Sequence, residues 1–293
     1  MTATFVVDRS ERGKLALTGS EAKDFLHGQV TNDILGLTPG HGCYAAFLTH
    51  KGKMLGDMRV FDLGDELLLD CERVSLQELF NMIRRYKLGR DVELHKRTLE
   101  LGLLSVIGPE APVLAGPDEH DNARVTLGGA PVVAVKTDVG VDLFFAPADR
   151  DAVRGALDFP DGDVGEAEVV RVEHGRPRYG IDLDDSVIPQ EAGLNERAVS
   201  FTKGCYVGQE TVARLYYRGK PNRRLLGLRL SEPVEPGTEL TLGEKVVGKV
   251  GSVVVSPEHG PIALALVRRE ANPGDTVALD GSTALIVDVP FAR

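Results

Sequence analysis

The chain has 293 residues, of which 42% are hydrophobic and 27% are charged, and its formal net charge is −10. This length is enough for about two or three domains with buried cores. The negative charge argues against a protein that wraps nucleic acid, because such proteins need a basic surface to displace counterions. The first residues contain no basic leader, and no apolar run approaches the roughly 18 residues of a membrane span, so we expect a cytoplasmic protein without membrane contact.

Residues 1–98 mix strand and helix patterns. Alternating apolar residues predict strands at 15–17, 44–48, 54–63 and 67–71, with a turn at 51–53. A first helix is predicted from Ser20 as its cap, with an apolar stripe that runs to Val30. A second helix is predicted from the capping box at 75–78. Together these patterns indicate an α+β unit.

Residues 99–222 again mix strand and helix patterns, and the sequence pattern changes from residue 223 onward. The middle segment predicts strands at 101–107 and 143–145, a hairpin at Gly128-Gly129, and helices near 149–157 and 166–174. The last segment predicts only short strands between Pro and Gly turns, at 225–230, 239–242, 246–255, 262–267 and 284–289. Such spacing is typical of a small barrel or sandwich. We therefore expect an α+β protein with domains at 1–98, 99–222 and 223–293, the last a β-barrel.

One cysteine lies in an unusual setting, the stretch 203–210 that reads Lys-Gly-Cys-Tyr-Val-Gly-Gln-Glu. Its two glycines leave room for a ligand to approach the main chain, and Lys203 could stabilise a thiolate at Cys205. The alternative is a buried cysteine that acts as a small hydrophobe. Cys43 and Cys71 lie in predicted strands, where packing is the expected role. The three cysteines form no C-x-x-C pair, so we expect neither a disulfide framework nor a metal site.

Five basic residues and two tyrosines follow this stretch between residues 214 and 224: Arg214, Tyr216, Tyr217, Arg218, Lys220, Arg223 and Arg224. This basic patch is either a solvated surface, a contact for RNA, or a dock for an anionic small molecule. Arginine suits the last role because its planar group donates two hydrogen bonds to one carboxylate.

The stretch 203–210 resembles the K-G-C-Y-x-G-Q-E signature of the YgfZ-type folate-binding proteins, relatives of the glycine-cleavage aminomethyltransferase. Other blocks resemble the same proteins in the same order. They are 27–33 (G-Q-V-T-x-D), 51–54 (K-G-K-M), 171–177 (R-x-E-x-G-x-P) and 188–194 (P-x-E-x-x-L). The resemblance implies a three-domain cloverleaf fold, with two interlocked α+β units and a C-terminal barrel around a central channel. The channel is expected to hold tetrahydrofolate, or a one-carbon-substituted or polyglutamylated folate.

The resemblance also implies functional residues. Glu191 is expected to bind the amide edge of the pterin, since two carboxylate oxygens can accept its adjacent N–H groups; the alternative is an exposed surface glutamate. Asn32, Asp33 and Tyr179 are further pocket candidates, with turn formation or ordinary packing as the alternatives. Asp57 is expected to polarise or position the folate. The remaining expected cofactor-binding residues are Gly204, Gly208, Gln209, Glu210 and Arg214.

Two departures from the relatives bear on the activity. Many aminomethyltransferases have paired acids after a G-G turn, whereas the matching stretch 51–57 retains only Asp57. Some YgfZ-type proteins flank folate with tryptophan, and this chain has no tryptophan.

Three functions are considered. The first is a tetrahydrofolate-binding accessory factor for iron-sulfur cluster assembly or repair, for example in radical-SAM tRNA-modifying enzymes, with Cys205 as the reactive thiol and Lys203 beside it. The second is a tetrahydrofolate-dependent aminomethyltransferase. The third is a tRNA-binding module. We expect the first, with folate and iron-sulfur client or assembly proteins as partners and at most a weak tRNA contact.

Overall fold

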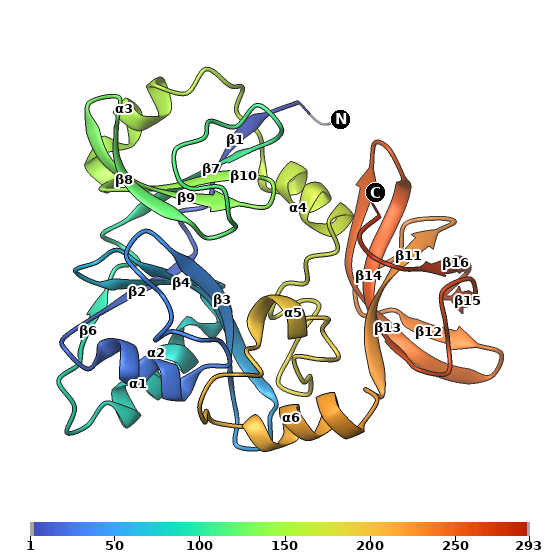
Figure 1. The fold of residues 1–293 in the computed structure, drawn as a ribbon. Helices are drawn as coiled ribbons and strands as arrows, with labels where there is room; N and C mark the ends of the chain where they lie inside the picture. Colours follow the sequence, from blue (N-terminus) through green and yellow to red (C-terminus); the bar gives the residue numbers. More distant parts are fainter. Residues whose placement is uncertain (1–2, 292–293) are drawn as a thin grey trace. The chain divides into compact units, whose positions relative to one another are not determined.

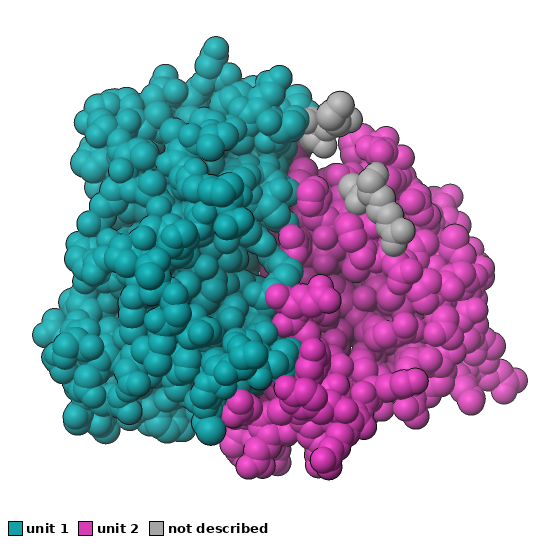
Figure 2. Space-filling view, viewed as in Figure 1, with its two compact units in different colours: residues 1–49, 55–164, 197–207 teal, residues 50–54, 165–196, 208–293 magenta. Residues whose placement is uncertain are grey.

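The computed structural model describes residues 3–291. The chain divides into two compact units (Figure 2). Unit 1 comprises residues 1–49, 55–164 and 197–207, and unit 2 comprises residues 50–54, 165–196 and 208–293. Both units are assembled from separate stretches of the chain. The predicted boundaries after residues 98 and 222 stay a prediction.

The first sheet of unit 1 has the strand order β3-β4-β5-β2-β6 (Figure 1). Its strands are β3 (Gly42–Leu48), β4 (Met54–Asp62), β5 (Leu67–Cys71), β2 (Gly13–Thr18) and β6 (Glu93–Lys96). Helices α1 (Ala22–Gln29) and α2 (Leu76–Tyr86) bury Phe25, Leu26, Leu79 and Ile83 in the same core as the sheet. The predictions of four strands and two helices here are confirmed. Strand β6 was missed because its four residues show no apolar alternation.

Both helix starts differ from the prediction in their hydrogen bonds. Ser20 does not cap α1, since its hydroxyl donates to Asp91 at 2.6 Å and the helix begins after Glu21. Ser75 does precede α2, at the end of the short 3-10 helix η1 (Arg73–Ser75). Its hydroxyl donates to the carbonyl of Glu72 at 3.0 Å, so the predicted capping box does not form.

The second sheet of unit 1 has the order β1-β7-β10-β9-β8. Its strands are β1 (Phe5–Asp8), β7 (Gly102–Ile107), β10 (Gly140–Phe145), β9 (Ala130–Thr137) and β8 (Asn122–Leu127). The predicted hairpin at Gly128-Gly129 is confirmed, and both glycines have positive φ, as a tight turn between β8 and β9 requires. The 3-10 helix η2 (Pro147–Asp149) and α3 (Arg150–Gly155) follow β10.

The two sheets of unit 1 share an apolar core and a buried ionic network. Phe61 and Leu68 of the first sheet pack with Leu103, Val135 and Phe144 of the second. In the second sheet, strand β1 pairs with β7, so residues near the start of the chain lie beside residues more than ninety positions away.

Unit 2 contains most of α4 (Val164–Glu173), the start of α5 (Asn195–Ala198), α6 (Gln209–Arg218) and a closed barrel. The barrel order is β11-β14-β13-β12-β15-β16, with β11 (Arg223–Leu230), β14 (Gly260–Arg268), β13 (Lys245–Ser256), β12 (Glu239–Leu242), β15 (Thr276–Leu279) and β16 (Ser282–Val287). Leu226, Leu228 and Leu230 alternate into its interior, and Leu225 packs outside it with Val172 of α4. The predicted barrel is confirmed. Within residues 3–291, no helix is long and apolar enough to cross a membrane.

Candidate functional site

A turn after α1 joins several of the sequence blocks within unit 1. The backbone N–H of Thr31 donates to Ala46, and the Thr31 hydroxyl donates to Ala198 at 2.5 Å. The Asn32 amide donates to the carbonyl of Tyr44 at 2.8 Å, and Asp33 accepts the N–H of Gly36 at 3.0 Å. Asn32 and Asp33 therefore form the turn that was the alternative to ligand binding. Their role toward a ligand stays a prediction.

The ammonium group of Lys203 lies at the carboxyl end of α1. It donates to the carbonyls of His27, Val30 and Asn32 at 2.5, 2.8 and 2.9 Å. The last carbonyls of a helix have no partner within the helix and carry a partial negative charge, so a lysine here stabilises the helix end. Burial lowers the pKa of Lys203 to about 8, and Asp33 opposes this shift.

These contacts supply a structural reason for a lysine at this place in the motif. Within residues 3–291, no hydrogen bond or ion pair joins Lys203 to Cys205. The expectation that Lys203 stabilises the Cys205 thiolate stays a prediction.

The three thiols differ in exposure. Cys205 is exposed, whereas Cys71 is buried in the core of the first sheet and Cys43 packs against that core. Burial raises the pKa of both Cys43 and Cys71 to about 12, which disfavours their thiolates. The packing roles predicted for Cys43 and Cys71 are confirmed, and so is the accessibility of Cys205. At Gly204, an added Cβ would meet only the Nε2 atom of His27, at 3.8 Å.

The second glycine of the motif begins α6 in unit 2. Gly208 has φ +85° and precedes Gln209 and Glu210 of the first helical turn. The turn at 51–53 packs on this helix start, because a Cβ at Gly52 would lie 2.8 Å from Cβ of Thr211. Two of the sequence blocks are thus packed together. Arg214 lies exposed further along α6.

Glu191 is buried in unit 2, so the alternative of an exposed surface glutamate is wrong. Its carboxylate accepts two hydrogen bonds from Arg223, at 3.2 and 2.9 Å, and one from the backbone N–H of Ile188 at 3.2 Å. A carboxylate offers about four acceptor positions, so one position on Oε1 remains. A pterin that used both oxygens would compete with Arg223. Arg223 was grouped with the basic patch, but its side chain is instead bound to Glu191 and Ser186.

Tyr179 lies half-buried in a turn of unit 2, where it forms an isolated bridge with Leu183. Among the described residues it belongs to no named helix or strand. Its expected role toward folate stays a prediction.

Asp57 is buried in unit 1 on β4, with one carboxylate oxygen that lacks a hydrogen-bond partner. Burial raises the pKa of Asp57 to about 6, against the effect of a hydrogen bond from the Tyr44 side chain. The guanidinium of Arg197 lies 5.1 Å from the Tyr44 ring centroid and bonds Glu119. The position therefore holds a carboxyl group that can take up or release a proton near neutral pH, in a polar setting with an unused acceptor.

His120 adds a strained backbone position and one unsatisfied ring nitrogen near Tyr44. Its φ of +77° is unusual for a residue other than glycine, and its ring centroid lies 6.3 Å from that of Tyr44. Nδ1 of the buried ring has no hydrogen-bond partner, and burial lowers the pKa of His120 to about 3. Sequence reasoning missed Tyr44, Arg197, Glu119 and His120 because they come from separate loops and strands. The strand alternation around Tyr44 was the only signal.

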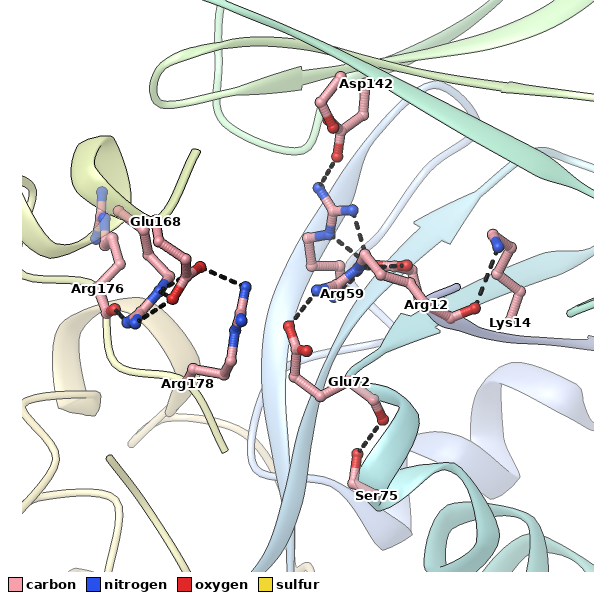
Figure 3. Close-up of polar contacts among 12 residues, drawn as sticks. Arg12, Lys14, Arg59, Glu72, Ser75, Asp142, Glu168, Arg176 and Arg178 are labelled. Carbon is pink, nitrogen blue, oxygen red and sulfur yellow. Dashed lines mark hydrogen bonds and ion pairs between the residues drawn. The ribbon is translucent and has the colours of Figure 1, made fainter. Parts of the chain in front are cut away.

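A separate buried network holds the two sheets of unit 1 together (Figure 3). Arg59 of β4 donates to Asp70 of β5 and to Asp142 of β10, and Arg12 donates to Asp70 and Glu72. Burial alone would raise the pKa of Asp70, but Arg12 and Arg59 hold it well below its ordinary value. Because every one of these charges has a partner, we regard this network as structural.

Two domains of the chain and its fold match known proteins. Residues 1–126 match the domain family described as "GCVT N-terminal domain". Residues 223–291 match the family described as "Glycine cleavage T-protein C-terminal barrel domain". A chloroplastic protein of Arabidopsis thaliana, provisionally named a transferase, is 29% identical over 312 aligned positions that cover 98% of this chain and 71% of that protein.

A solved structure has the same fold. The glycine cleavage system aminomethyltransferase T of Bartonella henselae matches with a TM-score of 0.86 and 21% identity, over 99% of this chain and 87% of that one. Residues 1–126 and 223–291 therefore match the N-terminal and C-terminal barrel domains of the glycine-cleavage T-protein, and the chain has the fold of the solved aminomethyltransferase.

Proposed function

We propose that this protein is a tetrahydrofolate-binding accessory factor for iron-sulfur cluster assembly or repair, with Cys205 as its reactive thiol. The matching domains support a folate-related binding or transfer role. The observation that carries the finer proposal is the contrast among the thiols: Cys205 is exposed within the signature, whereas the thiols of Cys43 and Cys71 have pKa values of about 12. We expect the protein to act in the cytoplasm, with client proteins rather than nucleic acid as its macromolecular partners.

The residues assigned to folate are chemically suited to it. Glu191 retains one acceptor position on Oε1, and the unpartnered oxygen of Asp57 can accept a further hydrogen bond or hold a proton. When bound, tetrahydrofolate would supply a carrier for a one-carbon unit. Glu191 would orient the ring system.

Calorimetric titration of tetrahydrofolate under anaerobic conditions tests the binding. We expect saturable binding by the native protein and weaker binding by Glu191→Gln, which keeps the size of the side chain. Glu244→Gln, on an exposed turn of the barrel, is the matched control and should bind like the native protein. Absence of binding by the native protein would reject the folate part of the proposal.

The role of Cys205 is tested in cells that depend on this protein for a cluster-containing enzyme. Cys205→Ser should fail to restore that enzyme, while Cys43→Ser, which removes a thiol packed on the core, should restore it. Full activity with Cys205→Ser would reject a reactive thiol.

A tetrahydrofolate-dependent aminomethyltransferase is the second candidate, and the match to both T-protein domains favours it. Retention of only Asp57 in the stretch 51–57 counts against it. Turnover with an aminomethylated lipoyl carrier protein would establish this activity, and its absence in a protein that binds folate would leave the accessory role.

A further inference from the structure

A cavity opens at the edge of the first sheet, outside the residues assigned to folate or to the thiol. It has a volume of about 400 Å³ and lies where α2, β6 and the turn at 98–100 meet. Leu15, Leu76 and Phe80 line its apolar wall together with Leu99. Leu99 is 87% exposed, so its apolar surface beside the cavity is open to a partner.

Strand β6 ends the sheet beside this cavity, since its one neighbour in the described strand order is β2 (Figure 1). The N–H of Arg97 donates to the carbonyl of Lys14 at 3.0 Å, so Lys14 and Arg97, next to the paired Leu15 and Lys96, form a pair joined by this one hydrogen bond, while the Lys14 N–H donates to Thr98. Because such pairs alternate along antiparallel strands, the backbone groups of Leu94 and Lys96 point away from β2. Within residues 3–291, no other backbone segment bonds to these groups. The outer edge of β6 can therefore accept another strand.

The rim of the cavity is basic although the chain as a whole is acidic. Arg73 and Lys96 line it, and Arg84 lies one helical turn beyond Phe80 on α2. Across the described residues 3–291, no ion pair includes these three side chains. The ammonium of Lys96 lies 4.8 Å from the Phe80 ring centroid, so it turns onto the cavity wall instead of covering the strand edge. Glu100 also lines the cavity, but its carboxylate holds Arg97 at 2.6 Å.

We propose that the groove between β6 and α2 binds an extended acidic segment of a partner protein, which adds to β6 as a further strand. Main-chain hydrogen bonds to Leu94 and Lys96 supply affinity, as in other cases where a peptide joins a sheet edge. One apolar side chain of the segment fills the cavity against Phe80 and Leu99. Flanking acidic side chains pair with the basic rim, because a strand places alternate side chains on the same face.

A short capped peptide that alternates Glu with Val and Leu is the probe, and fluorescence anisotropy of the labelled peptide measures binding to the full chain. We expect saturable binding that weakens with salt, and none for the same peptide with Lys in place of Glu. Reversal of the rim charge in Lys96→Glu should weaken binding by about tenfold, equivalent to about 1.4 kcal/mol. Lys245→Glu, the same change at an exposed position of the barrel, is the control and should leave binding unchanged.

Hydrogen exchange separates strand addition from a general attraction of charges. Bound peptide should slow exchange of the Leu94 and Lys96 amides, and Leu99→Glu should abolish both binding and protection while the exposed position spares the fold. The proposal is overturned by the absence of saturable binding, by equal effects of Lys96→Glu and Lys245→Glu, or by binding without protection of β6. If the protein without peptide forms a dimer in which the β6 amides are protected from exchange, the edge of β6 binds a second copy of the chain. That result would also overturn the proposal.

Discussion

Replacement of Asp57 by asparagine should stabilise the protein at alkaline pH, although it alters a buried residue of the candidate site. The carboxyl group lies in unit 1 with one oxygen that has no partner, and burial raises its pKa from 3.8 to about 6. Asparagine removes the buried charge and keeps an oxygen to accept the Tyr44 hydrogen bond.

The pH dependence follows from the direction of the shift. Because the folded state holds its proton more tightly than the unfolded state, ionisation of Asp57 lowers stability as the pH rises from about 4 through about 6. A difference of roughly two units corresponds to about 3 kcal/mol at about pH 8, and to about half of that at about pH 5. Asp57→Asn should recover up to these amounts.

Urea unfolding followed by far-ultraviolet circular dichroism, at both pH values, measures the effect. Asp70→Asn is the matched control, since Arg12 and Arg59 hold the pKa of Asp70 well below its ordinary value. Its stabilising contribution is present at neutral pH and is lost as the pH falls through its folded pKa, so this variant should destabilise at both conditions. Loss of stability in Asp57→Asn, or a gain that does not grow with pH, would refute the reasoning.

Three other predictions follow from the contacts of single residues. Lys203→Met leaves three carbonyls at the end of α1 without their donor and should lower the free energy of unfolding by about 1–3 kcal/mol. Hydrogen exchange in α1 should become faster, and unchanged exchange would contradict this role of Lys203. Iodoacetamide should modify Cys205 in the native protein and Cys71 only after unfolding, as mass spectrometry can show; early labelling of Cys71 would be inconsistent with its burial. Gly52→Ala should lower the melting temperature, because φ is +75° and the new Cβ would lie 2.8 Å from Thr211; an unchanged temperature would show that the turn relaxes.

Elements with local signals could be predicted from the sequence. Strand β16 alternates between buried and exposed residues, and the Gly128-Gly129 turn has one favourable geometry. The resemblance of the sequence blocks also indicated both T-protein domains. Short strands such as β1 and β6 could not be recognised, because pairing with distant strands, and not their own pattern, makes them strands.

The residue types and their order were enough to indicate the barrel, the two helices of the first sheet and the block around Cys205. Only the tertiary structure decided what those residues contact: Lys203 holds the end of α1, Arg223 holds Glu191, and Tyr44 joins Asp57. The physical reason is the range of the forces involved. Periodicity and turn chemistry act over a few residues, whereas desolvation and ion pairing depend on which distant segments exclude water from a group.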